Sequence, residues 1–481
     1  MNLKIIFRVL GFLLIVEGIA MCIALLVALI YGESDILAFL ISAGINLAIG
    51  GAIAVGTTKA KKEIGKREGF IIVSMVWIVF SFFGSLPYII SGSIPSFTDA
   101  FFETISGFTT TGSSILNDIE ALPHGMLFWR SITQWLGGMG IIVLSLAILP
   151  VFGIGGMQLF MAEVPGPTPD KISPRIKQTA KTLWVIYLAF TIAETLLLWI
   201  GGMSFFDAIC HSFTTMATGG FSTKQASIAH WPSPFIQYVI IIFMFLAGTN
   251  FTLSYFAIKG KFSVAYKDEE FKYYSFFTLG FTALIFIGLL ITTQLGVEKA
   301  FRDALFQVIT IITTTGYATA DYLTWAPVLT MLIFLLFFFG GSAGSTGGGI
   351  KIMRIVVLLK NGYYELKRLV HPNAIIPVRF NKHSVDAKIV TNVLAFFMIY
   401  FVIFAFSTVI FTLIEPDMES SMGAVATCLG NIGPGLGSVG PAENFYHIKP
   451  VGKWFLSFLM LLGRLELFTV LVLFSPSFWK E

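Results

Sequence analysis

The sequence predicts an all-α polytopic membrane protein with four parallel helix–half-helix–helix repeats around one axis, preceded by two extra N-terminal transmembrane helices. Three observations support this fold class. Hydrophobic residues make up 56% and charged residues 12% of the 481 positions, whereas soluble domains average about 25% charged residues. Ten apolar stretches are long enough to cross a bilayer, and four shorter ones end at a glycine in the same relative position. Lipid must therefore cover much of the surface.

The long stretches predict ten spans, because about 20 helical residues cross the roughly 30 Å of hydrocarbon in a bilayer. Seven contain no charged residue: 36–55, 69–90, 135–160, 235–258, 273–295, 325–350 and 389–414. Three contain one or two charged residues: 9–30, 182–200 and 454–474. The run at 9–30 is too long for the apolar core of a signal peptide, so we expect it to be the first span.

Basic residues are distributed unevenly between the two sides of these spans. One side holds 24 of the 31 lysines and arginines, in residues 1–8, 56–68, 161–181, 259–272, 351–388 and the C-terminal tail. By the positive-inside rule this side is the cytoplasm, so both termini are predicted to be cytoplasmic. The basic segment 351–388 either docks a partner protein or is simply retained inside by its charge.

Four short apolar segments lie between paired spans on the other side: 99–111, 207–219, 303–315 and 420–432. At about 12 residues each they are too short to cross, which predicts re-entrant half-helices. They open with Asp99, Asp207, Asp303 and Ser420, which we expect to be N-caps. A glycine follows each of these residues at an offset of 13, and a looser second register of glycines follows 25 to 30 residues later: Gly138, Gly248, Gly341 and Gly463.

The equal offsets indicate parallel repeats related by an axis along the membrane normal. The chain then divides into two N-terminal helices and four repeats, with these expected boundaries: 1–58, 69–160, 178–260, 270–360 and 385–481.

This repeat has a specific electrostatic consequence. A re-entrant half-helix points its negative C-terminal carbonyl end at the membrane centre, and the chain returns in extended form, with glycine permitting carbonyls to face one axis. A ring of such carbonyls replaces the hydration shell of a cation, so the half-helices become pore helices around one pore. The predicted filter comprises Thr110, Thr111, Gly112, Thr218, Gly219, Gly220, Thr314, Thr315, Gly316, Asn431, Ile432 and Gly433. The expected cation ligands are Thr111, Gly112, Gly219, Gly220, Thr315, Gly316, Ile432 and Gly433.

The alternative is that Gly and Thr serve only close helix packing, as they do in many membrane helices. One Thr-Thr-Gly would suit that interpretation, but four glycines at one offset favour a repeated site. The third repeat's Thr314-Thr315-Gly316-Tyr317 is also close to the Thr-Val-Gly-Tyr of potassium-channel filters.

Residues 340–349 interrupt an otherwise apolar span with eight glycines or serines in ten positions. Such a run breaks a helix and leaves carbonyls that water or protein must meet. A close-packed helix crossing is the alternative. Arg464 follows Gly463 as Ser342 follows Gly341, which places its charge beside the pore below the filter. An arginine in mid-span costs about 2.5–3.5 kcal/mol, so it must find carbonyls or water, unless it extends to the interface.

With these motifs the sequence resembles the Trk/Ktr/HKT superfamily of potassium transporters along nearly its whole length. The resemblance rests on the Gly-Gly-Phe-Ser at 219–222, on Asn431-Ile432-Gly433-Pro434-Gly435-Leu436, on the glycine-rich run 340–349 and on Gly463-Arg464-Leu465-Glu466. The fourth filter departs from the pattern because it lacks Thr-Thr.

The resemblance implies potassium uptake across the bacterial cytoplasmic (inner) membrane through a K⁺-selective pore, with K⁺ as the transported ion. It implies a homodimer with one pore per subunit, and a cytosolic TrkA-like nucleotide-binding subunit that controls opening. The intramembrane gate would comprise Gly344, Ser345, Thr346, Gly347, Gly348 and Gly349 together with Arg464.

Two other classes of protein fit parts of this sequence. Gly340 to Gly344 fits the GxSxG pattern of a serine hydrolase, but that chemistry needs a histidine at membrane depth. All six histidines fall in segments predicted to be outer or cytoplasmic, so we expect no enzyme. The channel-like subunit of an ATP-driven potassium pump shares the four-repeat plan, and the gate and Arg464 argue against it. The GxGxxG at 435–440 lacks a βαβ context, so no nucleotide is expected on this chain.

Overall fold

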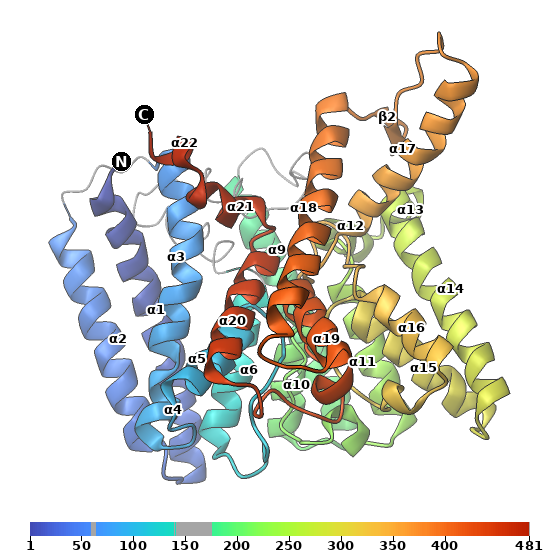
Figure 1. Ribbon diagram of the computed structural model, residues 1–481. Helices are drawn as coiled ribbons and strands as arrows, with labels where there is room; N and C mark the ends of the chain where they lie inside the picture. The colour runs from blue at the N-terminus through green and yellow to red at the C-terminus, as the bar shows by residue number, and fades with distance from the viewer. Residues whose placement is uncertain (59–63, 139, 141–175, 481) are drawn as a thin grey trace.

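The computed structural model describes residues 1–58, 64–138, 140 and 176–480. Most of the span expected at 135–160 and most of the segment 161–181 therefore fall outside the described residues. Within the described ranges, six helices are long and apolar enough to cross a membrane, or up to eight if each bent pair counts as one span. The N- and C-termini lie at the same end of the molecule (Figure 1).

The unbroken spans match the sequence prediction closely. They are α1 (Leu3–Tyr31), α2 (Ile36–Gly56), α3 with α4 (Lys66–Gly84 and Leu86–Ser91), α9 (Ile176–Ile200), α14 (Glu269–Thr292) and α18 (Ala387–Phe411). Helices α1 and α2 pack at very short range, because a Cβ built on Gly50 would lie 2.7 Å from the carbonyl oxygen of Gly11. Small residues at such crossings let transmembrane backbones approach.

The second helix of repeats two, three and four is broken. This corrects the prediction of continuous spans at 235–258 and 454–474, whereas a break at 340–349 was expected from the glycine-rich run. Helix α11 (Pro234–Ala247) meets α12 (Phe251–Ile258) at a bend of 110°, and the same angle separates α20 (Pro450–Arg464) from α21 (Phe468–Leu471) with η5 (Val472–Phe474). Helix α16 (Pro327–Leu336) has only ten residues before an irregular loop. The breaks lie at or beside Gly248, Gly341 and Gly463 of the second glycine register, and hydropathy alone does not detect them.

Four half-helices lie where the short apolar segments predicted them. They are α5 (Phe97–Phe108), α10 (Phe205–Met216), α15 (Val297–Ile312) and α19 (Met418–Gly430). All four share one level, in the half of the molecule remote from the termini (Figure 1).

Three of the four predicted N-caps of these half-helices are wrong by three residues, and the fourth by seven. The capping side chains belong to Ser96, Ser204 and Asp417, which accept hydrogen bonds from the backbone N–H groups of Asp99, Asp207 and Ser420. Those three residues thus occupy the first turn, where an acid still suits the helix dipole. Helix α15 starts earlier, after Gly296, so Asp303 lies in its second turn and pairs with Lys299 at 2.7 Å.

The remaining elements connect these spans. They are α6 (His124–Gly138), η2 (Ser227–His230), α13 (Phe262–Lys267), η3 (Tyr322–Thr324), α17 (Ile352–Val370), η4 (Gly437–Val439) and α22 (Pro476–Trp479). A two-residue hairpin pairs β1 (Arg379–Phe380) with β2 (His383–Ser384) in antiparallel register. Its turn residues Asn381 and Lys382 both have positive φ, which suits the twist of a tight hairpin.

Candidate ion pathway

Each of the four half-helices ends in the same unusual backbone conformation. The residue two positions before each predicted filter glycine has a left-handed φ: 53° at Thr110, 53° at Thr218, 57° at Thr314 and 53° at Asn431. Non-glycine residues rarely adopt this region, and each such residue stores about 1–3 kcal/mol of strain. The glycines that follow also have positive φ, of 83° at Gly112, 78° at Gly220, 83° at Gly316 and 107° at Gly433.

The backbone N–H groups beyond this turn point back into their own half-helix. In every repeat the residue before the filter glycine donates to the carbonyl five residues earlier. The donors Thr111, Gly219, Thr315 and Ile432 make these bonds at 2.9, 2.8, 2.8 and 3.0 Å. The donors are satisfied on the helix side. Two carbonyls of these segments also accept side-chain donors, Gly219 from the Gln134 amide at 2.7 Å and Gly433 from the Ser113 hydroxyl at 3.1 Å, and each keeps a second lone pair.

The four segments close into a ring. A Cβ built on each glycine would lie against a carbonyl oxygen of the next repeat: 2.2 Å from Gly219 for Gly112, 2.0 Å from Thr315 for Gly220, 2.0 Å from Ile432 for Gly316 and 3.0 Å from Thr111 for Gly433. The contacts run from repeat one to two, three, four and back to one. Only glycine combines this conformation with so close an approach of a neighbouring carbonyl.

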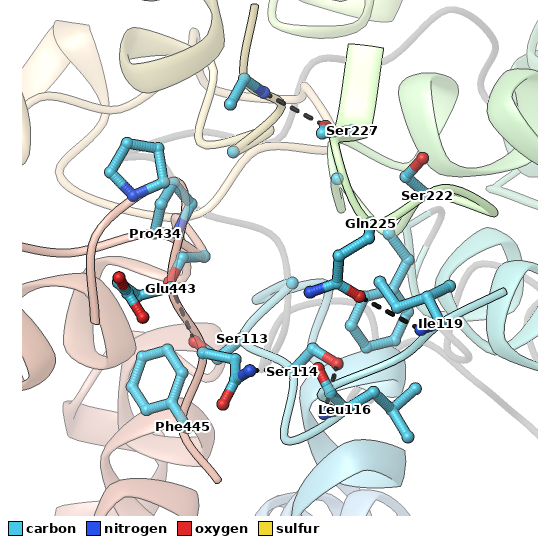
Figure 2. A pocket seen from close by; sticks show the side chains of 18 of the residues that line it. Ser113, Ser114, Leu116, Ile119, Ser222, Gln225, Ser227, Pro434, Glu443 and Phe445 are labelled. Atoms are coloured by element: carbon cyan, nitrogen blue, oxygen red, sulfur yellow. Dashed lines mark hydrogen bonds between the residues drawn. The ribbon is translucent and has the colours of Figure 1, made fainter. Parts of the chain in front are cut away.

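A polar depression lies on the side of the ring remote from the chain termini (above the ring). All four of these glycines line it. Figure 2 shows Pro434, Glu443 and Phe445 on one side of it, facing Ser222 and Gln225 on the other. Glu443 is an exposed residue at the mouth of this depression. The walls of the depression are therefore supplied by different repeats.

On the side of the ring opposite to this depression (below the ring) lies the glycine-rich loop 340–349. Hydrogen bonds hold this loop against the surrounding repeats. Its N-terminal part is held at Ser342, whose N–H donates to the carbonyl of Gly248 at 2.8 Å. The Thr346 hydroxyl donates to the carbonyl of Met216 at 3.0 Å. The N–H of Gly348 donates to the Thr314 hydroxyl at 2.7 Å, so the loop contacts the filter segment of repeat three directly.

Two positively charged side chains, those of Lys351 and Arg464, also donate hydrogen bonds to carbonyls of this loop. The buried Lys351 ammonium donates to Gly347 at 2.6 Å. One guanidinium nitrogen of Arg464 donates to the Thr346 carbonyl at 2.9 Å and to the Thr110 hydroxyl at 3.0 Å. The other donates to the carbonyls of Gly137 and Gly138 at 2.6 and 3.1 Å. Arg464 thus joins the loop to the filter segment of repeat one.

The sequence analysis missed Glu270, the second residue of α14. One oxygen of its buried carboxylate accepts the N–H groups of Ala343 at 2.7 Å and Met353 at 3.1 Å, which bracket the loop. An acid in the first turn of a helix is ordinary, so its sequence position carries no signal of this contact. Glu466 pairs with Arg354 of α17, rather than with its near neighbour Arg464.

The structure brings the twelve predicted filter residues together at one level and the predicted loop residues beneath them. His211 lies in the outer segment 207–219, as predicted, and it is fully buried there within half-helix α10. Its ring nitrogens contact the carbonyl of Asp207 at 2.7 Å and the Ser222 hydroxyl at 2.9 Å. These are structural contacts within repeat two.

The family model for the TrkH cation transport proteins matches residues 36–481. The chain belongs to the TrkH family. It is 44% identical to the Trk system potassium uptake protein TrkH of Escherichia coli K12 over the whole of both chains. It is 34% identical to the TrkG protein of the same strain, over 100% of this chain and 99% of that one.

The crystal structure of the potassium transporter TrkH from Vibrio parahaemolyticus matches over both full chains, with a TM-score of 0.90 and 40% identity. The protein is therefore a multi-pass membrane protein with the four-repeat TrkH fold, and its homologues are transporters and not enzymes.

Proposed function

We propose that this TrkH family member takes up potassium through a K⁺-selective pore formed by its four repeats. The closed ring of filter segments carries the proposal, because each glycine lies against a carbonyl of the next repeat and the last repeat meets the first. A cation on the axis of such a ring exchanges its hydration shell for protein carbonyls. Full-length relatives named potassium uptake proteins support the choice of ion.

The proposed K⁺ ligands are the carbonyls of the two residues that end each filter segment. They belong to Thr111 and Gly112, Gly219 and Gly220, Thr315 and Gly316, and Ile432 and Gly433. The negative ends of the four half-helices add a field that favours a cation at this depth. In the fourth repeat, where Asn431 takes the place of threonine, its amide donates to the Thr111 hydroxyl at 2.9 Å and braces the ring.

The proposed gate is the loop from Gly344 to Gly349 with Arg464. The loop lies under the ring and blocks the way to the cytoplasm, and a fixed positive charge beside the path raises the electrostatic energy of a passing cation. Opening then requires the loop to leave its contacts with Arg464, Lys351 and Glu270.

The proposed assembly is a homodimer in the bacterial inner membrane, with both termini in the cytoplasm and a TrkA-like nucleotide-binding subunit on that side. The basic surface of α17 and the following hairpin, which lies at the same end as the termini, suits this contact (Figure 1). The relatives' membership of a named Trk system supports more than one component.

Ion flux in liposomes tests the function. The purified chain should admit K⁺ in preference to Na⁺, and Gly112→Ser should relax that preference, because its Cβ would meet the Gly219 carbonyl at 2.2 Å and force the ring apart. Equal permeability of the two ions in the wild-type protein, or an unchanged ratio in a folded Gly112→Ser protein, would refute the proposed filter.

A further inference from the structure

A fully buried ion pair lies behind the ring, between half-helix α5 and helix α6. The Nε of Arg130 donates to Oε1 of Glu103 at 2.9 Å, and a terminal nitrogen of Arg130 lies 2.8 Å from the same oxygen. The exposed fractions of the two side chains are 1% and 0%. Buried pairs of this kind contribute little net stability, but removing one partner strands a buried charge at a cost of about 3–5 kcal/mol.

The hydrogen bonds of this pair lead to the segments just beyond two ring glycines. The Glu103 carboxylate accepts the N–H of Ile115 at 2.9 Å and the Ser114 hydroxyl at 3.0 Å, immediately after Gly112. Arg130 donates to the carbonyl of Ser222 at 3.0 Å, two residues after Gly220. One charge pair therefore ties the outgoing chains of repeats one and two together.

The guanidinium has further contacts at the same seam. Its carbon lies 4.1 Å from the centroid of the Phe221 ring, which follows Gly220. The terminal nitrogen that lies beside Glu103 also donates to the Ser114 hydroxyl at 3.3 Å. At two neighbouring seams, tyrosine hydroxyls reach backbone carbonyls close to the ring. The Tyr317 hydroxyl donates to the carbonyl of His211, and the Tyr322 hydroxyl to that of Gly435.

We propose that Glu103 and Arg130 are a positioning pair that sets the width of the ring between repeats one and two, and through it the preference for K⁺ over Na⁺. The inference rests on the proposed function of the ring. Neither side chain contacts the ion. The pair acts by holding the Ser114 and Ser222 segments at a fixed separation, so that the adjacent carbonyls cannot close around a smaller cation or drift apart.

The test is the K⁺ to Na⁺ permeability ratio of the full-length protein in liposomes. Glu103→Gln keeps the size of the side chain and removes its charge, so the ratio should fall roughly tenfold while K⁺ flux stays within about twofold. Asp99→Asn is the matched control, because it removes the negative charge from another ion pair of α5. In that pair Asp99 lies 2.6 Å from Lys453, near the start of the helix and away from the ring. The control should leave the ratio unchanged.

Ser114→Ala covers the possibility that Glu103→Gln does not fold. It removes only the hydroxyl shared by Glu103 and Arg130, so the ratio should shift in the same direction by a smaller factor. An unchanged ratio in folded Ser114→Ala protein, together with a changed ratio in Gly112→Ser, overturns the positioning role and leaves the filter intact. Unchanged ratios in both overturn the filter itself.

Discussion

In the ring, each repeat positions its own backbone through bonds that recur four times. Among the described residues, the loop beneath it occurs in repeat three alone and is held by single side chains of repeats three and four. The ring uses a left-handed residue, a glycine and a hydrogen bond five residues back in every repeat. The loop 340–349 depends on Arg464, Lys351 and Glu270, each far from the others in sequence. Local, repeated bonds suit a site of fixed width, while a few dispersed charged contacts can be released together.

The difference also separates two kinds of mutational effect. Changes in the ring should alter which ion passes, or stop passage, because the carbonyls themselves move. Changes in the contacts of the loop should alter how much ion passes and leave selectivity unchanged. Three substitutions and one deletion test this division, in descending order of expected effect.

Gly220→Val should have the largest effect. A β-branched residue resists the observed φ of 78°, and its Cβ would lie 2.0 Å from the Thr315 carbonyl oxygen. We expect flux of both ions to fall at least about a hundredfold. Gly280→Val, measured in the same flux assay, is the control, because a Cβ on Gly280 would have no neighbouring atom within 4 Å. Near-normal flux in Gly220→Val would show that the ring is not the ion path.

Deletion of residues 343–347 should raise K⁺ flux by about tenfold or more, since it removes the obstruction below the ring. The K⁺ to Na⁺ ratio should stay at the wild-type value, because the ring lies above the deletion. Flux and selectivity are measured on dimeric, correctly inserted protein. Loss of flux in that preparation would mean that the loop supports the fold and does not gate it.

Arg464→Ala should raise flux several-fold, because it removes a positive charge and the hydrogen bonds to Thr346, Thr110 and the end of α6. Arg464→Lys should retain most of the barrier, because a lysine keeps the positive charge. It should not retain all of it, because a lysine cannot reproduce the fork of guanidinium donors. The comparison is made by initial rates of K⁺ uptake into liposomes. Lower flux in well-folded Arg464→Ala protein would contradict a barrier role.

Glu270→Gln should have the smallest effect, about a twofold rise in flux. The amide oxygen can still accept from Ala343 or Met353, but without the charge that strengthens both bonds. Glu298→Gln serves as the matched control, because Glu298 occupies the second position of α15 and pairs with Arg302 at the other end of the molecule from the loop. A change in ion selectivity in Glu270→Gln would break the division between ring and loop.

The repeated features of the fold could be predicted from sequence, and the features that depend on tertiary contact could not. The glycine offset located all four half-helices, because identical local chemistry leaves an identical spacing. The breaks after α11 and α20 escaped detection because the hydropathy of the long apolar flanks outweighs the few polar residues at each break, Thr249 and Asn250 in one and Arg464 and Glu466 in the other. Gly463 marks such a break only through its contact with another helix, where a Cβ would lie 2.1 Å from the Leu429 carbonyl oxygen.

The caps and the loop anchors show the same limit. Asp99 and Asp207 look like N-caps, but Ser96 and Ser204 lie one turn earlier and fill that position. Spacing also does not reveal the order of the repeats around the axis, which rests on backbone contacts between residues that are far apart in the sequence, such as Gly433 and Thr111. Glu270 is recognisable as an anchor only once the loop is seen folded onto the start of α14.

The contact between Gly433 and Thr111 has a consequence for biosynthesis. It joins the first repeat to the last, so the ribosome must finish the fourth repeat before a complete carbonyl ring can form. A nascent chain with three inserted repeats has an open side and no enclosed ion path. Partly synthesised molecules in the membrane are thereby prevented from leaking ions and dissipating the voltage of the cell.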